Sequence, residues 1–173
     1  QKPFSHNHDL TLLGGNSRTN FTGSVNYRDW DGVLLRSGQE RLNVRADLNH
    51  DMFDGKLRSR MQVISNTITA RQGGSSDYMW RQAMIRNPTD RVLNEQGKWQ
   101  ESNAYMYDNP LGMIHETTND RMFRETRMNG SLDYRPTTAL SFKALFSRVQ
   151  DNDLTGTSTT FDHVNTTKNN LNG

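Results

Sequence analysis

Residues 20–30 read Asn-Phe-Thr-Gly-Ser-Val-Asn-Tyr-Arg-Asp-Trp, and this stretch decides the fold. Phe21, Gly23, Val25 and Tyr27 share one parity, whereas the residues between them are all polar. Because successive side chains of a β-strand point to opposite faces, the stretch predicts a strand with one apolar or small face and one polar face. Its length matches the roughly 9–11 residues that a tilted strand needs to cross a bilayer.

The same alternation appears in five further stretches of the chain. We predict these strands at residues 8–13, 41–50, 56–69, 126–135 and 140–150. The connections are alternately short and long, with turn signals such as Asp54-Gly55 at the short ones. A membrane barrel has this pattern, because its turns are short at one end and its loops are long at the other. The predicted fold is therefore all-β, an antiparallel up-and-down meander that forms part of a transmembrane β-barrel.

Two long stretches lack the alternation. Residues 70–123 contain Asn87-Pro88, Asn109-Pro110 and several aromatic residues, and residues 151–173 are rich in Thr, Asn and Gly. A structureless loop of this length argues against a compact soluble domain but is expected at the extracellular end of an outer-membrane barrel. We predict one extracellular loop over 70–123, with a helical turn near residues 82–86, and a second, truncated one over 151–173. Residues 1–173 together are predicted to be one partial barrel domain.

The composition excludes several functional classes. Only 32% of the 173 residues are hydrophobic, which is low for a packed soluble core but compatible with a barrel whose lumen is polar. The absence of cysteine excludes disulfide scaffolds and cysteine chemistry. A net charge of +2 without a long basic run gives no reason to expect a nucleic-acid partner. No long apolar run is present, so no transmembrane helix is expected.

The sequence also lacks the motifs of common enzymes and metal sites. No Ser-His-Asp spacing, nucleophile elbow, HExxH motif or phosphate-binding glycine loop occurs, so we predict no enzymatic activity, no catalytic residue and no cofactor. The spacing from Asp151 to Asp162 resembles that of a calcium loop, but flanking helices are not apparent and an ordinary polar loop is favoured. His6 and His8 share a parity without a third ligand nearby. No metal site is predicted.

The number of predicted strands points to a larger protein. Bacterial single-chain membrane barrels begin at about 8 strands, so six cannot close one. The chain begins Gln1-Lys2-Pro3-Phe4 without the signal peptide that an exported protein would need. A mature chain, a fragment and a cytosolic protein would all fit this beginning, and the strand pattern favours a piece of a larger barrel.

A set of short stretches, taken in order, resembles a known family. The stretches are His6-Asn7-His8-Asp9-Leu10 running to Gly14-Gly15-Asn16, Asn20-Phe21 to Tyr27-Arg28-Asp29 and Gly32, Arg41-Leu42-Asn43-Val44-Arg45-Ala46, Asn87-Pro88, Gly97-Lys98-Trp99, Asn109-Pro110-Leu111, Arg127 to Tyr134, and Leu140-Ser141-Phe142. Together they look like the SusC-like TonB-dependent transporters of Bacteroidetes-type outer membranes. The resemblance covers nearly the whole chain.

This resemblance implies a 22-stranded barrel with an N-terminal plug in the cell outer membrane. Such a transporter imports oligosaccharides or peptides when TonB pulls on it, and a SusD-like lipoprotein lids its extracellular face. The chain would supply the first barrel strands after the plug and would contact outer-membrane lipid. The plug and the TonB-binding segment would belong to parts of the parent protein outside this chain.

Two groups of residues are candidates for substrate contact. Arginines on the polar strand faces would give a positive lumen wall that attracts anionic substrate, or would hydrogen-bond the plug and one another. Aromatic residues of the long loop would stack on sugar rings, contact the lipoprotein, or pack the loop on itself. The predicted substrate-binding residues are Trp80, Trp99, Tyr105, Arg45, Arg58 and Arg60.

Two rival functions remain open at this point. A structural or adhesive outer-membrane barrel would use the loops only for attachment. A soluble β-rich glycan-binding module would have to cover the apolar strand faces with a second layer, whereas in a barrel these faces meet lipid.

Overall fold

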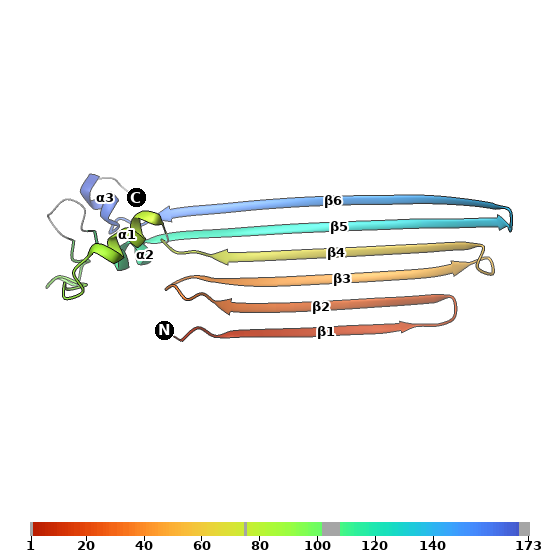
Figure 1. Cartoon of the computed structure of the whole chain (residues 1–173), viewed down its shortest axis with the longest axis horizontal. Coiled ribbons are helices and arrows are strands. Elements are labelled where there is room, and N and C mark those ends of the chain that lie inside the picture. The colour runs from red at the N-terminus through yellow and green to blue at the C-terminus, as the bar shows by residue number, and fades with distance from the viewer. Residues whose placement is uncertain (1, 75, 102–107, 170–173) are drawn as a thin grey trace.

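The computed structural model describes residues 2–74, 76–101 and 108–169. Its six strands form one open antiparallel sheet in the order in which they occur in the chain (Figure 1). The strands are β1 (Ser5–Gly15), β2 (Thr19–Asp31), β3 (Gly38–Met52), β4 (Leu57–Arg71), β5 (Thr117–Thr137) and β6 (Leu140–Thr159). This arrangement confirms the predicted all-β meander and is consistent with part of a barrel.

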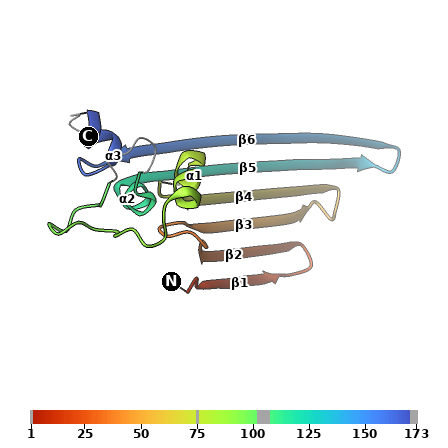
Figure 2. The ribbon, with the colours of Figure 1, turned by 60° about the vertical axis from the view of Figure 1, so that its left-hand side comes forward.

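The two ends of the sheet differ. Short turns join β1 to β2, β3 to β4 and β5 to β6 at one end. The opposite end carries α1 (Asp77–Ile85), α2 (Pro110–Glu116) and α3 (Val164–Asn169), which Figure 2 shows gathered beside the ends of the strands. We call these three helices and the segments that join them to the strands the helical cap. The three short turns therefore lie at one end, as predicted, while the opposite end carries the link 32–37 between β2 and β3 and the much longer segment 72–116 between β4 and β5.

The strand register gathers most of the large apolar side chains of the sheet on one face. Directly opposed residues point to the same face, and β2 and β3 pair Phe21 with Leu48, Val25 with Val44 and Asn26 with Asn43. Because the side-chain period of a strand is two, this register unites the apolar parities of neighbouring strands. The resulting apolar face includes Leu10, Leu12, Phe21, Val25, Tyr27, Leu42, Val44, Leu48, Leu57, Met61, Val63, Met128, Leu132, Tyr134, Phe142 and Phe146.

Neither face of the sheet is covered. No residue of the six strands, all of which lie in the described ranges, is buried. Large apolar side chains of the apolar face stand open, with Leu12 63% exposed and Phe146 62% exposed. The buried apolar cluster lies instead in the helical cap, where Met79, Met113, Ile114 and Val164 pack together. Among the described residues, no helix has both the length and the apolar character needed to cross a membrane.

All six strands extend beyond their predicted bounds, and the largest extensions are those of β5 and β6 next to the helical cap. β4 ends at Arg71 and β5 begins at Thr117, so the predicted loop 70–123 is shortened at both ends. β6 continues to Thr159 through the first part of the predicted loop 151–173. Most residues at these strand ends are polar on both faces, and apolar ones such as Met122, Phe123 and Leu154 do not alternate with them in a regular pattern. The ladder hydrogen bonds come from the backbone and need no such pattern. α1 likewise begins before the predicted turn at 82–86.

Candidate functional site

The polar face is crossed by rows of side-chain hydrogen bonds. In one row, Gln62 Nε2 donates to Asp47 Oδ1 at 2.7 Å, and Asn129 Nδ2 donates to Gln62 Oε1 at 3.2 Å. Ser147 Oγ continues the row by donating to Asn129 Oδ1 at 2.8 Å. Asn26 holds a second row by donating to Asn7 and accepting from Asn43. Together the two rows link all six strands. They hold the polar side chains in an ordered surface, which we call the polar wall.

The three predicted arginines all lie on this wall, but they differ in their partners. Arg45 forms a two-pronged ion pair with Asp47, at 2.6 and 3.2 Å, and thereby joins the Gln62 row. Arg58 lies 3.9 Å from Asp51 beside the β3–β4 turn. Arg60 forms no ion pair within the described ranges. The wall therefore carries both positive and negative side chains. Among the described residues, Arg60 is the one of these three arginines without a carboxylate partner.

Polar side chains cap the N-terminal ends of α1 and α2. Ser76 Oγ accepts the Met79 N–H at 3.1 Å at the start of α1. Asn109 Oδ1 accepts the Leu111 N–H at 3.1 Å at the start of α2, where Pro110 occupies the first turn. Both residue types accept hydrogen bonds from backbone N–H groups that a helix start leaves free, and proline has no N–H that would need an acceptor there. These caps explain why short helices form within the segment predicted to be a loop.

The two described aromatic residues of the predicted set, Trp80 and Trp99, lie in the helical cap and not beside the arginines. Trp99 Nε1 donates to Glu116 Oε1 at 2.8 Å, and its ring stacks on His115 with centroids 5.4 Å apart. Trp80 lies on α1 and is 45% exposed. Tyr105 lies outside the described residues. Trp80 thus presents an open ring surface, whereas Trp99 packs against α2.

Sequence reasoning missed a polar cluster at the centre of the helical cap. The buried Asp108 carboxylate accepts a hydrogen bond from Tyr78 Oη at 2.6 Å and a close ion pair from Lys168 Nζ, and the Asp108 N–H donates to Gln82 Oε1 at 2.9 Å. Burial disfavours the carboxylate, but the bonds from Lys168 and Tyr78 outweigh it and lower the pKa of Asp108. The cluster ties α1 and α3 to the residue that precedes the start of α2.

A second acid fixes the cap to the sheet. Glu116 accepts from Thr160 Oγ1 and from Trp99, and the Thr160 N–H donates to the Glu116 carbonyl at 2.9 Å. The bond from Thr160 lowers the pKa of Glu116, and the bond from Trp99 adds to this effect against the opposing effect of burial. Since Glu116 ends α2 immediately before β5, these contacts set how the cap sits on the ends of β5 and β6.

His163 should make the helical cap sensitive to acid. Its side chain is buried, and Nδ1 accepts the Asn165 N–H at 3.1 Å at the start of α3. Burial lowers the pKa of His163, although Glu116 and Asp108 partly oppose this effect. A folded-state pKa below the unfolded value of about 6.5 means that stability is complete above that pH and falls as the pH drops below it. We expect the opening constant of α3 to rise by at most about tenfold per pH unit there, as followed by hydrogen exchange.

The matched variant for this expectation is His163→Asn. An asparagine at a helix start accepts the same backbone N–H but does not titrate in this range. The variant should keep α3 closed between pH 7.5 and 5.5, where the wild-type cap loosens. Equal acid sensitivity in the two proteins would assign the effect to another group.

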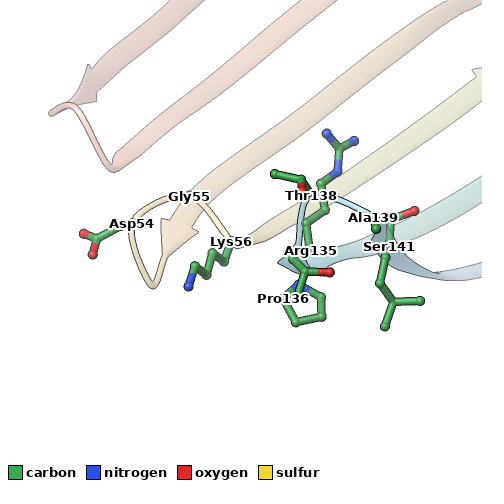
Figure 3. Close-up of a pocket in the computed structure, with 10 residues that line it drawn as sticks. Asp54, Gly55, Lys56, Arg135, Pro136, Thr138, Ala139 and Ser141 are labelled. Carbon is green, nitrogen blue, oxygen red and sulfur yellow. The ribbon is translucent and has the colours of Figure 1, made fainter.

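A depression lies at the short-turn end of the sheet (Figure 3). It has a volume of about 690 Å³ and is lined by the turn at Asp54–Lys56 and by residues from Arg135 to Ser141. The Arg135 guanidinium is engaged by Asp133 at 3.0 Å, and the Arg135 N–H donates to the Lys56 carbonyl at 2.7 Å. The depression is therefore a gap between two turns, and the Arg135 side chain that borders it already has a carboxylate partner.

Nothing in the described ranges assembles a metal site. No group of three or more His, Asp or Glu side chains there is placed to hold an ion. Asp153, from the stretch that resembles a calcium loop, lies in the extended strand β6 and pairs with Arg121 of β5. An extended strand spreads its carboxylates along its length and does not wrap them around an ion.

Comparison with known proteins gives one distant relative and no matching family model. The chain is 25% identical over 150 residues to a TonB-dependent receptor of Formosa agariphila. This match covers 85% of the chain but 15% of the relative, so the chain spans only a small part of that protein's length. The similarity supports a relationship to TonB-dependent receptors, and with the β-rich fold it suggests the outer membrane.

Proposed function

We propose that this chain forms part of the barrel wall of an outer-membrane, TonB-dependent importer. Its apolar face would lie against lipid, its polar face would line the lumen, and its helical cap would lie on the extracellular side. The observation that carries the proposal is the apolar face itself, which runs unbroken over all six strands and is covered by nothing in the described chain. A soluble protein would bury such a face against a second layer.

The dimensions of the apolar face support a membrane setting. From Phe21 to Tyr27, β2 advances roughly 20 Å at about 3.4 Å per residue. Outer-membrane barrels carry an apolar band about 25 Å tall between girdles of aromatic residues. Tyr27 lies at the cap side of the band, and Tyr134 stacks with Phe142 at the short-turn side with ring centroids 6.5 Å apart. At 21 and 20 residues, β5 and β6 exceed this band and would carry the cap beyond the membrane.

We further propose a SusC-like importer of oligosaccharides or peptides that works with a SusD-like lipoprotein, and no enzymatic activity. The half-exposed Trp80 is the cap residue best suited to stack on a sugar ring or to meet the lipoprotein. Arg60 is the lumen residue best suited to meet an anionic substrate, since Arg45 and Arg58 have carboxylate partners. The TonB contact would come from other parts of the parent protein.

Spin labels placed singly at positions 20–28 of the full-length protein test the barrel assignment. Labels at Phe21, Val25 and Tyr27 should be accessible to oxygen dissolved in the lipid, and labels at Asn20, Ser24 and Asn26 to a water-soluble quencher. Exposure without this alternation would favour the soluble glycan-binding module. A transporter is then separated from an adhesive barrel by whether substrate uptake requires TonB.

A further inference from the structure

The apolar face carries a groove between β4, β5 and β6. It has a volume of about 260 Å³ and almost only apolar atoms in its lining. By strand alternation, the side chains on its walls are Ser59, Met61, Gly130, Leu132, Ala144 and Phe146. The small residues Ser59, Gly130 and Ala144 open the hollow, and the large ones flank it. A smooth band would not offer such a channel to a hydrocarbon chain.

The groove is open at Gly130 because this residue has no side chain, and no neighbouring group prevents a side chain there. A Cβ built on Gly130 would meet only Phe146 Cβ, at an ordinary contact distance of 3.9 Å, and the Gly130 backbone lies outside the left-handed region. A side chain would therefore fit here without strain and would fill the groove. Gly23 provides a matched site, since it lies on the apolar face of β2 with nothing within 4 Å.

A positive zone lies directly between this groove and the helical cap. Arg148 follows Phe146 on the same face of β6, roughly 7 Å further along the strand. Arg124 lies on the same face of β5, and neither arginine forms an ion pair within the described ranges. The other residues of this zone are Ser65, Thr67, Thr126, Met128, Gln150 and Asn152, which include no carboxylate.

The same side of the neighbouring strands is arranged differently. There Arg71 lies 3.8 Å from both Asp29 and Glu40, and His6 lies 3.7 Å from Asp29. The charge of Arg71 is therefore paired with two carboxylates within the sheet. The free positive charge on the apolar-face side of the sheet is thus concentrated above the groove.

We infer that the groove and Arg148, aided by Arg124, bind an anionic, phosphate-bearing membrane lipid. One acyl chain would lie between Met61, Leu132 and Phe146, and the phosphate would meet the Arg148 guanidinium. Arginine suits this task because its planar fork donates two hydrogen bonds to phosphate and sheds water readily. The inference rests on the proposed function, because it requires the apolar face to lie against lipid.

The test uses the full-length protein, purified in detergent and stripped of lipid. Native mass spectrometry would measure its binding of dioleoyl phosphatidylglycerol and of dioleoylglycerol, which has the same acyl chains and no phosphate. We expect the anionic lipid to bind about tenfold more tightly, in line with a hydrogen bond between charged groups. Arg148→Gln should remove this preference, and Gly130→Leu should weaken the binding of both lipids.

Two controls separate this site from general effects. Gly23→Leu adds the same side chain elsewhere on the apolar face, and Arg127→Gln removes an arginine from the polar face of β5. Both variants should bind lipid like the wild type. Equal binding of the two lipids by the wild type, or a Gly23→Leu loss as large as that of Gly130→Leu, would overturn the lipid site. Spin labels that still alternate on β2 would then leave the barrel assignment standing, whereas labels without alternation would remove both.

Discussion

Replacing Val44 with arginine should destabilise the full-length barrel by about 2–4 kcal/mol, the cost of a lipid-facing charge near the bilayer midplane. Val44 lies in the middle of the apolar run of β3, between Val25 on β2 and Ser65 on β4. An arginine there would have to desolvate its guanidinium or distort the bilayer to reach water. Equilibrium unfolding from phospholipid vesicles in guanidinium would measure the loss.

The adjacent residue gives the control for this prediction. Asn43 lies on the polar face, opposite Asn26 and Asn66, and its side chain makes one hydrogen bond to Asn26 at 3.3 Å. Asn43→Arg should cost no more than about 1 kcal/mol, the typical value of a single hydrogen bond. If the two variants lost equal stability, the two faces would be in similar surroundings and the membrane assignment would be wrong.

The sheet could be predicted because one parity of each strand is apolar. Once Val25 and Val44 are required to share a face, slips of one residue between β2 and β3 are excluded, since they would mix the two faces. The short turns carry their own signal, as at Asp54, where a φ of 55° precedes the glycine. Local sequence and global topology agree in this part of the chain.

The strand ends next to the helical cap could not be predicted in the same way. In β5 and β6, residues such as Asp120 and Thr157 are polar whichever face they occupy, so no period marks them as strand. Their pairing is held by the backbone ladder and by cross-strand pairs such as Arg121 with Asp153. Such pairs become visible only when the register is known.

The candidate site likewise has a part that the sequence predicts and a part that it does not. Alternation alone placed Arg45, Arg58 and Arg60 together on one wall, and the structure keeps them there. The pairing of Asp108 with Lys168 joins residues separated by 60 positions, which no local pattern reveals. A local signal did exist for α2, since Asn109-Pro110 is a typical helix start.

Replacing Met79 with alanine should release the helical cap while leaving the sheet intact. Met79 is 2% exposed and packs with Met113, Ile114 and Val164, which form the whole buried apolar cluster of the described chain. Truncating a buried methionine costs about 2–5 kcal/mol through lost contacts and the remaining cavity. We expect the amides of α1 and α2 to exchange faster by a corresponding factor in the full-length protein, and those of β2 and β3 to be unchanged.

Met84 supplies the control, because it lies on the same helix and is 80% exposed. Met84→Ala removes the same atoms from the surface and should change stability by no more than about 0.5 kcal/mol. Slow exchange of α1 in the Met79 variant would mean that the polar cluster around Asp108 holds the cap without the apolar one. Faster exchange in both variants would instead mean that contacts of α1 outside its buried core hold the cap. Only a loss confined to Met79→Ala assigns the order of the cap to its buried core, and hence the position in which Trp80 is presented.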